Sequence, residues 1–209
     1  MHVLALDTAT PAVTAGVVEL TADGYAARSV RVVHDARKHA ELLMPGVLAA
    51  CDEAGIALAD LSAVVTGAGP GPFTGLRVGM VTAAALGDAL GIPVHGVCSL
   101  DAIAHGLGPV VVVTDARRRE VYWSAYDHTG TRVAGPGLAK PADLDEAIRA
   151  SWPDAVGWDR VTALSIPAWR LGALAADRLT SGAPFAEDAP LYLRDPDVTM
   201  PGAPKRVKQ

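Results

Sequence analysis

The pattern of apolar and polar positions predicts a series of short strands at the start of the chain. Apolar runs at residues 3–7 and 13–19 are separated by the turn Thr8-Ala9-Thr10-Pro11, and residues 28–33 alternate basic and apolar side chains. A short apolar run bounded by turn residues is typical of a buried strand, and alternation is typical of a half-exposed one. We therefore expect two successive hairpins.

Helical periodicity follows. In residues 38–54, Leu43, Val47 and Cys51 recur at every fourth position, and Gly55 ends the predicted helix. Pro45 either opens this helix or kinks it. The next predicted elements are a strand at 63–66, a helix at 74–90 and a strand at 94–97. This order predicts three strands in hairpins that continue as a parallel sheet with crossing helices.

The second half repeats the pattern. It predicts strands at 110–115, 121–127 and 131–134, a helix at 141–150, a strand at 155–157 and a helix at 167–178. Residues 7–19 and 115–127 each begin with an Asp at a strand end and return as a strand closed by a carboxylate. We interpret this as a duplicated β-β-β-α unit with the second copy cut short. From residue 183 prolines are frequent, and we expect an extended, partly disordered tail.

Composition narrows the class of protein. Half of the 209 residues are apolar but only 5% are aromatic, so the core must be mainly aliphatic. The net charge of −5 argues against a large basic nucleic-acid surface. The two cysteines, Cys51 and Cys98, form no CxxC motif. Because neither a signal peptide nor a membrane span is evident, we expect a cytoplasmic chain with no membrane association.

A glycine-rich loop lies between the predicted strand at 63–66 and the helix at 74–90. Glycines in such a place permit close backbone approach and can cradle an anion at a helix N-terminus. The alternative is a purely structural tight turn, and the spacing is not that of a P-loop. The candidate ligand-binding residues of this loop are Gly69, Gly71, Thr74, Gly75 and Arg77.

The helix behind the loop carries a stripe of small residues, because Gly75, Gly79, Ala83, Gly87 and Gly91 recur every four positions. Glycine inside a helix costs about 1 kcal/mol relative to alanine, so another backbone must come close. Packing on the chain's own sheet and contact with a second chain are both open. A contact with a second chain would use the flat face at 78–86.

Asp7 and Asp115 end equivalent strands. Two such carboxylates facing a cleft can hold a Mg²⁺-nucleotide or act as a base. Neither following turn contains glycine, and the bulky side chains of Arg117–Arg119 would occupy the phosphate space, so capping of nearby amides is the alternative. This arginine run and the tail residues Lys205, Arg206 and Lys208 are the basic clusters, interpreted as solvated faces or a supporting RNA contact. No HxxxH or HExxH motif is present, so no metal site is expected.

Several motifs together resemble the TsaB (YeaZ) family. They are Asp7-Thr8-Ala9-Thr10, His39-Ala40-Glu41, Gly69-Pro70-Gly71-Pro72-Phe73-Thr74-Gly75-Leu76-Arg77, Cys98-Ser99-Leu100, Asp115-Ala116-Arg117 with Glu120-Val121-Tyr122, and Pro190-Leu191-Tyr192-Leu193-Arg194. Pro72 replaces the family's serine and removes a loop hydroxyl and an amide. The motifs follow one another in order along almost the whole chain, but none of them falls within residues 130–185.

The resemblance implies an α/β fold of two ribonuclease-H-like lobes, the actin-like ATPase fold, with an abbreviated C-terminal lobe. Residues 1–100 would form the first lobe and 101–209 the second. The implied role is that of a non-catalytic subunit that dimerises with TsaD and supports TsaE binding during formation of N6-threonylcarbamoyladenosine next to the tRNA anticodon. It would contact tRNA mainly through the complex and form a homodimer when TsaD is absent.

The resemblance also implies which residues meet the partner, since the family dimerises through the helices that correspond to residues 38–54 and 74–90. The expected interface residues are His39, Leu42, Leu43, Val47, Leu76, Gly79, Met80, Ala83, Ala84 and Gly87. No catalytic residue, metal or resident cofactor is implied, and ATP or ADP at the junction with TsaD stays open. The alternatives are an actin-fold ATPase or kinase that uses Asp7 and Asp115, and a metallopeptidase.

Overall fold

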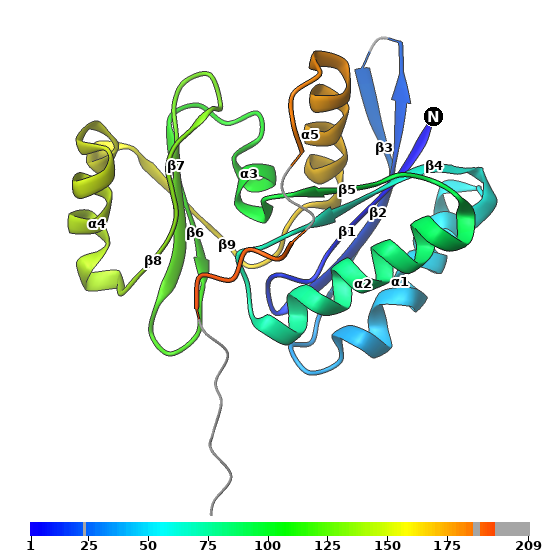
Figure 1. Ribbon diagram of the computed structural model, residues 1–209, viewed down its shortest axis with the longest axis horizontal. Helices are drawn as coiled ribbons and strands as arrows, with labels where there is room; N and C mark the ends of the chain where they lie inside the picture. Colours follow the sequence, from blue (N-terminus) through cyan, green and yellow to red (C-terminus); the bar gives the residue numbers. More distant parts are fainter. Residues whose placement is uncertain (23, 186–188, 195–209) are drawn as a thin grey trace, which may run out of the picture.

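The computed structural model describes residues 1–22, 24–185 and 189–194 and contains two β-sheets with helices packed on their faces (Figure 1). The five-stranded sheet has the order β3-β2-β1-β4-β5 and the four-stranded sheet has the order β8-β7-β6-β9. In each sheet the first strand lies between its hairpin partner and a parallel strand. This shared order confirms the predicted mixed α/β fold with a duplicated, shortened second unit.

The first sheet is formed by the two predicted hairpins and their parallel continuation. Its strands are β1 (His2–Asp7), β2 (Ala12–Thr21), β3 (Gly24–His34), β4 (Leu61–Gly67) and β5 (Val94–Val97). A single 3₁₀ turn, Leu58–Asp60, precedes β4. The helices α1 (His39–Ala54) and α2 (Phe73–Leu90) lie beside each other on this sheet. Both end at a glycine in the left-handed conformation, Gly55 and Gly91.

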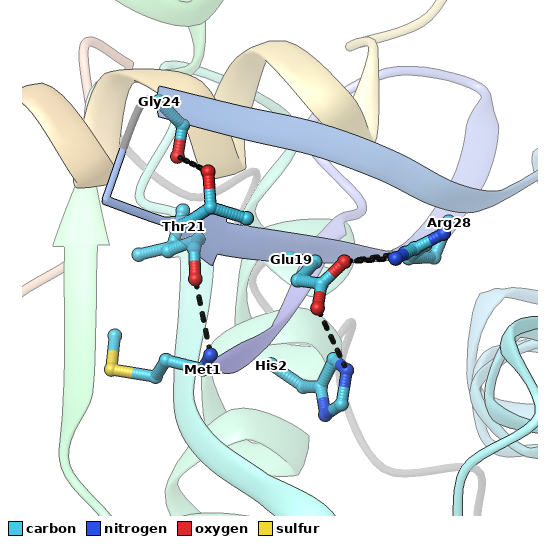
Figure 2. Close-up of polar contacts among 7 residues, drawn as sticks. Met1, His2, Glu19, Thr21, Gly24 and Arg28 are labelled. Carbon is cyan, nitrogen blue, oxygen red and sulfur yellow. Dashed lines mark hydrogen bonds and ion pairs between the residues drawn. The ribbon is translucent and has the colours of Figure 1, made fainter.

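Polar contacts join the three antiparallel strands at one end of this sheet (Figure 2). Glu19 of β2 accepts a hydrogen bond of 2.7 Å from Nε of Arg28 on β3, and its other oxygen lies 4.0 Å from His2 on β1. The amino group of Met1 donates to the carbonyl of Leu20 at 3.1 Å. These contacts tie β1, β2 and β3 to one another at this end of the sheet.

The second sheet carries one helix and two 3₁₀ turns. Its elements are β6 (Val110–Asp115), β7 (Val121–Tyr126), β8 (Arg132–Ala139), the turn Pro141–Asp143, α4 (Leu144–Ser151), the turn Pro153–Gly157 and β9 (Asp159–Ala163). The strand predicted at 155–157 is therefore wrong, because these residues form the 3₁₀ turn that begins at Pro153. The strand follows at β9.

Two helices join the lobes. The short helix α3 (Ser99–Ala104) is not predicted by the sequence pattern, since six residues are too few to show a period. The helix α5 (Ala168–Ser181) packs on β1, β2 and β3 of the first sheet. A Cβ on Gly172 would lie 2.5 Å from Val18 of β2, which shows how closely α5 approaches. Although assigned by sequence to the second lobe, α5 contributes to the core of the first.

One mainly aliphatic core extends through both lobes. It combines Val3 and Val65 of the first sheet with Val112 of the second and with Leu171 of α5. Residues 189–194 then run back along both lobes, where the amide of Leu191 donates to the carbonyl of Ala68 at 2.8 Å and Arg194 donates to the carbonyl of Ala116 at 3.1 Å. The rest of the predicted tail and its basic residues, Lys205, Arg206 and Lys208, lie outside the described residues.

Candidate functional site

The glycine loop between β4 and α2 is packed against its own chain. A Cβ on Gly71 would lie 2.5 Å from the carbonyl oxygen of Ala9. The carbonyl of Gly69 accepts from the amide of Ser99 at 2.7 Å, and the amide of Gly69 donates to the Ser99 hydroxyl at 3.2 Å. The contacts of Gly69 and Gly71 are therefore those of a structural tight turn, and both residues are buried.

Asp7 is buried beneath this loop. Its Oδ2 accepts a hydrogen bond of 2.6 Å from the Ser99 hydroxyl, and its Oδ1 accepts one of 2.7 Å from the amide of Ala9. Burial raises the pKa of the Asp7 carboxyl to about 6, and the two hydrogen bonds lower it in part. Asp115 is exposed, and its Oδ1 accepts from the amide of Arg117 at 3.0 Å.

The two carboxylates do not line the cleft between the lobes, which is bordered by other residues. The arrangement needed to hold a Mg²⁺-nucleotide between Asp7 and Asp115 is therefore not formed. Each carboxylate instead accepts a backbone amide two residues further on, which is the capping alternative left open by the sequence.

The small-residue stripe of α2 faces the first sheet. The Thr8 hydroxyl donates to the carbonyl of Gly75 at 2.7 Å, and a Cβ on Gly79 would lie 2.4 Å from the Thr8 Oγ1. A Cβ on Gly87 would lie 2.2 Å from a methyl group of Val94. The stripe therefore lets α2 approach the turn after β1 and strand β5, which is the internal packing alternative.

This packing corrects part of the expected partner interface. Six of its residues are buried within the chain, because the apolar faces of α1 and α2 are needed to cover the sheet: Leu43, Val47, Leu76, Gly79, Ala83 and Gly87. His39 is also buried, with Nε2 at 2.8 Å from the carbonyl oxygen of Thr10. Leu42 and Met80 are partly exposed and Ala84 is exposed, so these three stay available to a partner.

An exposed apolar surface remains on the outer sides of the two helices. Val81 of α2 is 66% exposed and Leu48 of α1 is 50% exposed. A groove of about 480 Å³ runs between the helices, lined by Ala40, Phe73, Thr74, Arg77, Val78, Val81 and Thr82. We call the surface formed by Ala40, Met44, Leu48, Val78, Val81, Ala84 and Ala85 the α1–α2 face. Side chains spaced by three or four residues lie on the same side of a helix.

A larger cleft of about 690 Å³ separates the lobes. One wall is formed by the starts of α1 and α2, and the opposite wall by the turn between β6 and β7. Its lining residues are Thr8, Ala36, Arg37, His39, Ala40, Gly71–Gly75, Val78, Ala116, Arg117, Arg118, Tyr122 and Arg194. Arg117 and Arg118 line this cleft, which stays open beside them.

The segment after α5 contributes to both sites. Tyr192 stacks on Phe73 with ring centroids 4.8 Å apart, and its hydroxyl accepts from Nε of Arg77 at 3.0 Å. The Arg77 guanidinium lies 4.0 Å from the centre of the Phe73 ring. Sequence reasoning missed Arg37, Tyr192 and Arg194 as site residues. The motif that contains Tyr192 and Arg194 is visible in the sequence, but their distance from α2 along the chain conceals the contact.

The described part of the chain shows neither a metal cluster nor a membrane-spanning helix. Within residues 1–22, 24–185 and 189–194, no three histidine, cysteine or acidic side chains gather as they would around a metal ion. No helix in these same ranges is long and apolar enough to cross a bilayer.

Comparison with known proteins relates the chain to tRNA modification proteins. Residues 33–155, more than half of the chain, match the family model described as TsaD, tRNA N6-adenosine threonylcarbamoyltransferase. An uncharacterised protein of Mycobacterium leprae is 58% identical over 68% of this chain and 40% of its own length. The Escherichia coli tRNA threonylcarbamoyladenosine biosynthesis protein TsaB is 35% identical over 60% of this chain. The match spans about half (55%) of that TsaB.

A solved structure agrees with the fold over a greater length. YeaZ from Pseudomonas aeruginosa superposes with a TM-score of 0.69 at 28% sequence identity. The match covers 92% of this chain and 99% of that one. The fold is therefore similar to that of a YeaZ protein over most of both chains.

Proposed function

The chain belongs to the TsaB (YeaZ) family, and from that premise we propose that it is a non-catalytic subunit in the formation of N6-threonylcarbamoyladenosine in tRNA. It acts by dimerising with a TsaD-type catalytic subunit through the α1–α2 face. TsaE then joins this heterodimer, and tRNA is bound mainly by the assembled complex. The proposal places the chain in the cytoplasm, where tRNA is modified.

The exposure of large apolar side chains on the α1–α2 face is the observation that carries the proposal. Val81 and Leu48 each leave half or more of their surface in water, although both belong to helices that bury another face in the chain's own core. Neighbouring exposed alanines, Ala84 and Ala85, add no bulk or charge. An exposed apolar surface of this kind is typical of a protein interface.

The same surface accounts for a homodimer when TsaD is absent. A face that is complementary to a structurally related partner can pair with a second copy of itself around a two-fold axis. We therefore expect the purified chain to self-associate, and the catalytic partner to compete with that association. Sedimentation of the chain alone and after addition of the partner measures both states.

The arrangement of carboxylates supports a subunit role over the ATPase or kinase alternative. Asp7 is 1% exposed and engaged by Ser99 and Ala9. A catalytic carboxylate must reach the substrate or its metal ion, and Asp7 is covered by its own chain. The proposal therefore assigns the chemistry to the partner and gives this chain a structural part in the complex.

The test combines a cellular and a biochemical measurement. Depletion of the chain, followed by mass spectrometry of tRNA nucleosides, is expected to lower threonylcarbamoyladenosine. A normal level would refute the role in modification. For the interface, the TsaD-type partner of the same organism is co-purified with wild type and with the variant Leu48→Glu/Val81→Glu.

The double variant is expected to lose the partner while remaining folded, since both side chains are largely in solvent. Leu164→Glu is the matched control, because Leu164 is 72% exposed on the other lobe. It should bind the partner as wild type does. Unchanged partner binding by Leu48→Glu/Val81→Glu would sink the assignment of this face.

A further inference from the structure

The cleft between the lobes is lined by arginine side chains, which are absent from the α1–α2 face. We infer that it binds the phosphate backbone of the RNA on which the complex acts. The inference rests on the proposed function for the identity of that RNA, and on the cleft itself for the site. The volume of about 690 Å³ lies in the range of pockets that hold small ligands, so a nucleotide-sized segment of a strand has room to enter.

The charged side chains that line the cleft are all arginines. They are Arg37, Arg117, Arg118 and Arg194, and His39 is the remaining basic group. No aspartate or glutamate is among the described residues of the lining, although the whole chain carries a net charge of −5. Four arginines therefore gather at the cleft of an acidic protein, as expected where a polyanion binds, and Arg194 among them is ion-paired with Glu120.

The arginines come from both walls. Arg37 precedes α1 on the first lobe, whereas Arg117 and Arg118 belong to the turn between β6 and β7 on the second, and all three are exposed. Arg194 is held in the second wall by its bond to the carbonyl of Ala116 and by an ion pair with Glu120. Guanidinium groups bind phosphate oxygens through paired N–H donors, so a strand in the cleft meets donors on two sides.

The turn that presents two of these arginines has an unusual backbone. Residues Arg117, Arg118 and Arg119 have φ values of 60°, 52° and 62°. Left-handed backbone carries a steric cost for any residue with a Cβ, and glycine would avoid it. This turn presents Arg117 and Arg118 to the cleft, whereas Arg119 shares the same backbone conformation outside the lining.

The composition of the walls distinguishes an RNA backbone from other phosphate ligands. A Mg²⁺-nucleotide needs carboxylates for its metal ion, and neither Asp7 nor Asp115 lines the cleft. Base recognition on single strands uses open aromatic faces. Phe73 is covered by Tyr192 and Arg77, and Tyr122 is only 3% exposed. What remains is contact with phosphates, which carries affinity without sequence preference.

Fluorescence anisotropy of labelled tRNA and of a single-stranded RNA tests the inference over a series of salt concentrations. It is applied to the chain alone and to its complex with the TsaD-type partner. The variants are Arg117→Ala/Arg118→Ala from one wall and Arg37→Ala from the other. The matched control is Arg119→Ala, which changes the same residue type in the same turn, at a position outside the cleft lining.

The double variant is expected to bind RNA at least about tenfold more weakly than wild type. The slope of log affinity against log salt should fall by about 0.7 for each phosphate that an arginine no longer neutralises. Arg37→Ala should weaken binding in the same direction, and Arg119→Ala should behave as wild type. Thermal unfolding of each variant identifies loss of folding, and the second wall provides an independent variant if one of them fails to fold.

Three results would overturn the inference. The first is wild-type RNA affinity in both cleft variants, and the second is absence of RNA binding by the chain and by the complex. The third is displacement of RNA by AMP or Mg²⁺-ATP at a concentration where a simple salt of the same ionic strength does not displace it. The last result would assign the cleft to a free nucleotide. If the variants still co-purify with the partner while RNA affinity is unchanged, this inference fails and the proposed function stands. If wild type does not bind the partner, the proposed function fails instead.

Discussion

The hydroxyl of Ser99 donates a hydrogen bond of 2.6 Å to the buried carboxylate of Asp7. The two residues lie 92 positions apart in the sequence and join the end of β1 to the start of α3. The amide of Gly69 donates to the same hydroxyl, and a Cβ on Gly67 would lie 1.7 Å from the carboxylate. Asp7 therefore holds the glycine loop and α3 together where its family motif suggested ligand chemistry.

The first prediction concerns the pH dependence of stability at Asp7. Its pKa in the folded chain is about 6, against 3.8 for the free side chain. The folded state therefore binds the proton more tightly, so the stabilisation is complete below about pH 4 and is lost as pH rises to 6. A difference of about two units between the folded and unfolded pKa values corresponds to about 3 kcal/mol of stability. Chemical denaturation from pH 4 to 7 should show this loss in wild type and not in Asp7→Asn.

Asparagine keeps an oxygen for the amide of Ala9 and an N–H for Ser99, so the variant tests charge with little change in shape. Asp88→Asn, which changes an exposed carboxylate of α2, should keep the wild-type pH profile. Parallel profiles for wild type and Asp7→Asn would show that the Asp7 carboxyl does not titrate in this range.

The second prediction uses the glycines of the two helices. Gly79→Ala should lower the free energy of unfolding by about 1–2 kcal/mol, because the new methyl group meets Thr8 Oγ1 at 2.4 Å and overpacking costs about 1–3 kcal/mol. Gly46→Ala in α1 should instead raise it by up to about 1 kcal/mol. The nearest atom to a Cβ there is the Ala15 Cβ at 4.0 Å. Urea denaturation compares the two, and stabilisation by Gly79→Ala would contradict the close approach of α2 to Thr8.

The third prediction concerns Asp101, which joins α3 to elements of both lobes. Its carboxylate accepts from the Tyr126 hydroxyl at 2.9 Å and from Arg178 of α5 at 2.9 Å, and it lies 3.3 Å from Arg132 of β8. Asp101→Ala should cost about 1–3 kcal/mol of stability, since it leaves the buried Tyr126 hydroxyl and the partly buried Arg178 guanidinium without their acceptor.

Asp145 offers the matched control, because its ion pair with Arg160 is exposed. Asp145→Ala should cost less than about 1 kcal/mol. Thermal and urea denaturation measure both variants. Equal losses for Asp101→Ala and Asp145→Ala would show that the contacts of Asp101 do not stabilise the junction between the lobes.

The fourth prediction concerns the two cysteines. Burial raises the pKa of the Cys98 thiol to about 12 and raises that of Cys51 above its usual value. Because the thiolate is the reactive form, both side chains should resist alkylation in the folded chain and react readily in concentrated urea. Mass spectrometry after timed iodoacetamide treatment measures this. Fast labelling of Cys98 under native conditions would show that the core around α3 opens readily.

The positions of most helices and strands could be predicted because their signals are local. Alternation at residues 28–33, fourfold spacing in α1, and Gly55 and Gly91 beyond the helix ends each depend on a few neighbouring residues. Where the local signal is short or mixed, prediction failed. The six-residue helix α3 shows no period, and the strand expected at 155–157 was displaced because Pro153 begins a 3₁₀ turn.

The candidate sites were predicted less well, because burial depends on residues far apart in the chain. A stripe of small residues identifies a close approach, and the sequence alone does not name the surface that approaches. The structure shows Thr8 and Val94 at that stripe, so Gly79, Ala83 and Gly87 are not available to a partner. The available face is the opposite one, around Val81.

By itself, the sequence determined the α/β class, the duplicated strand order and the family, since periodicity, turn residues and short motifs are all properties of adjacent positions. The tertiary structure alone decided that Asp7 is buried and that arginines from separate segments face one cleft. It also decided that α5 returns to the first sheet. These outcomes depend on which distant segments share space, and only the packed chain specifies that.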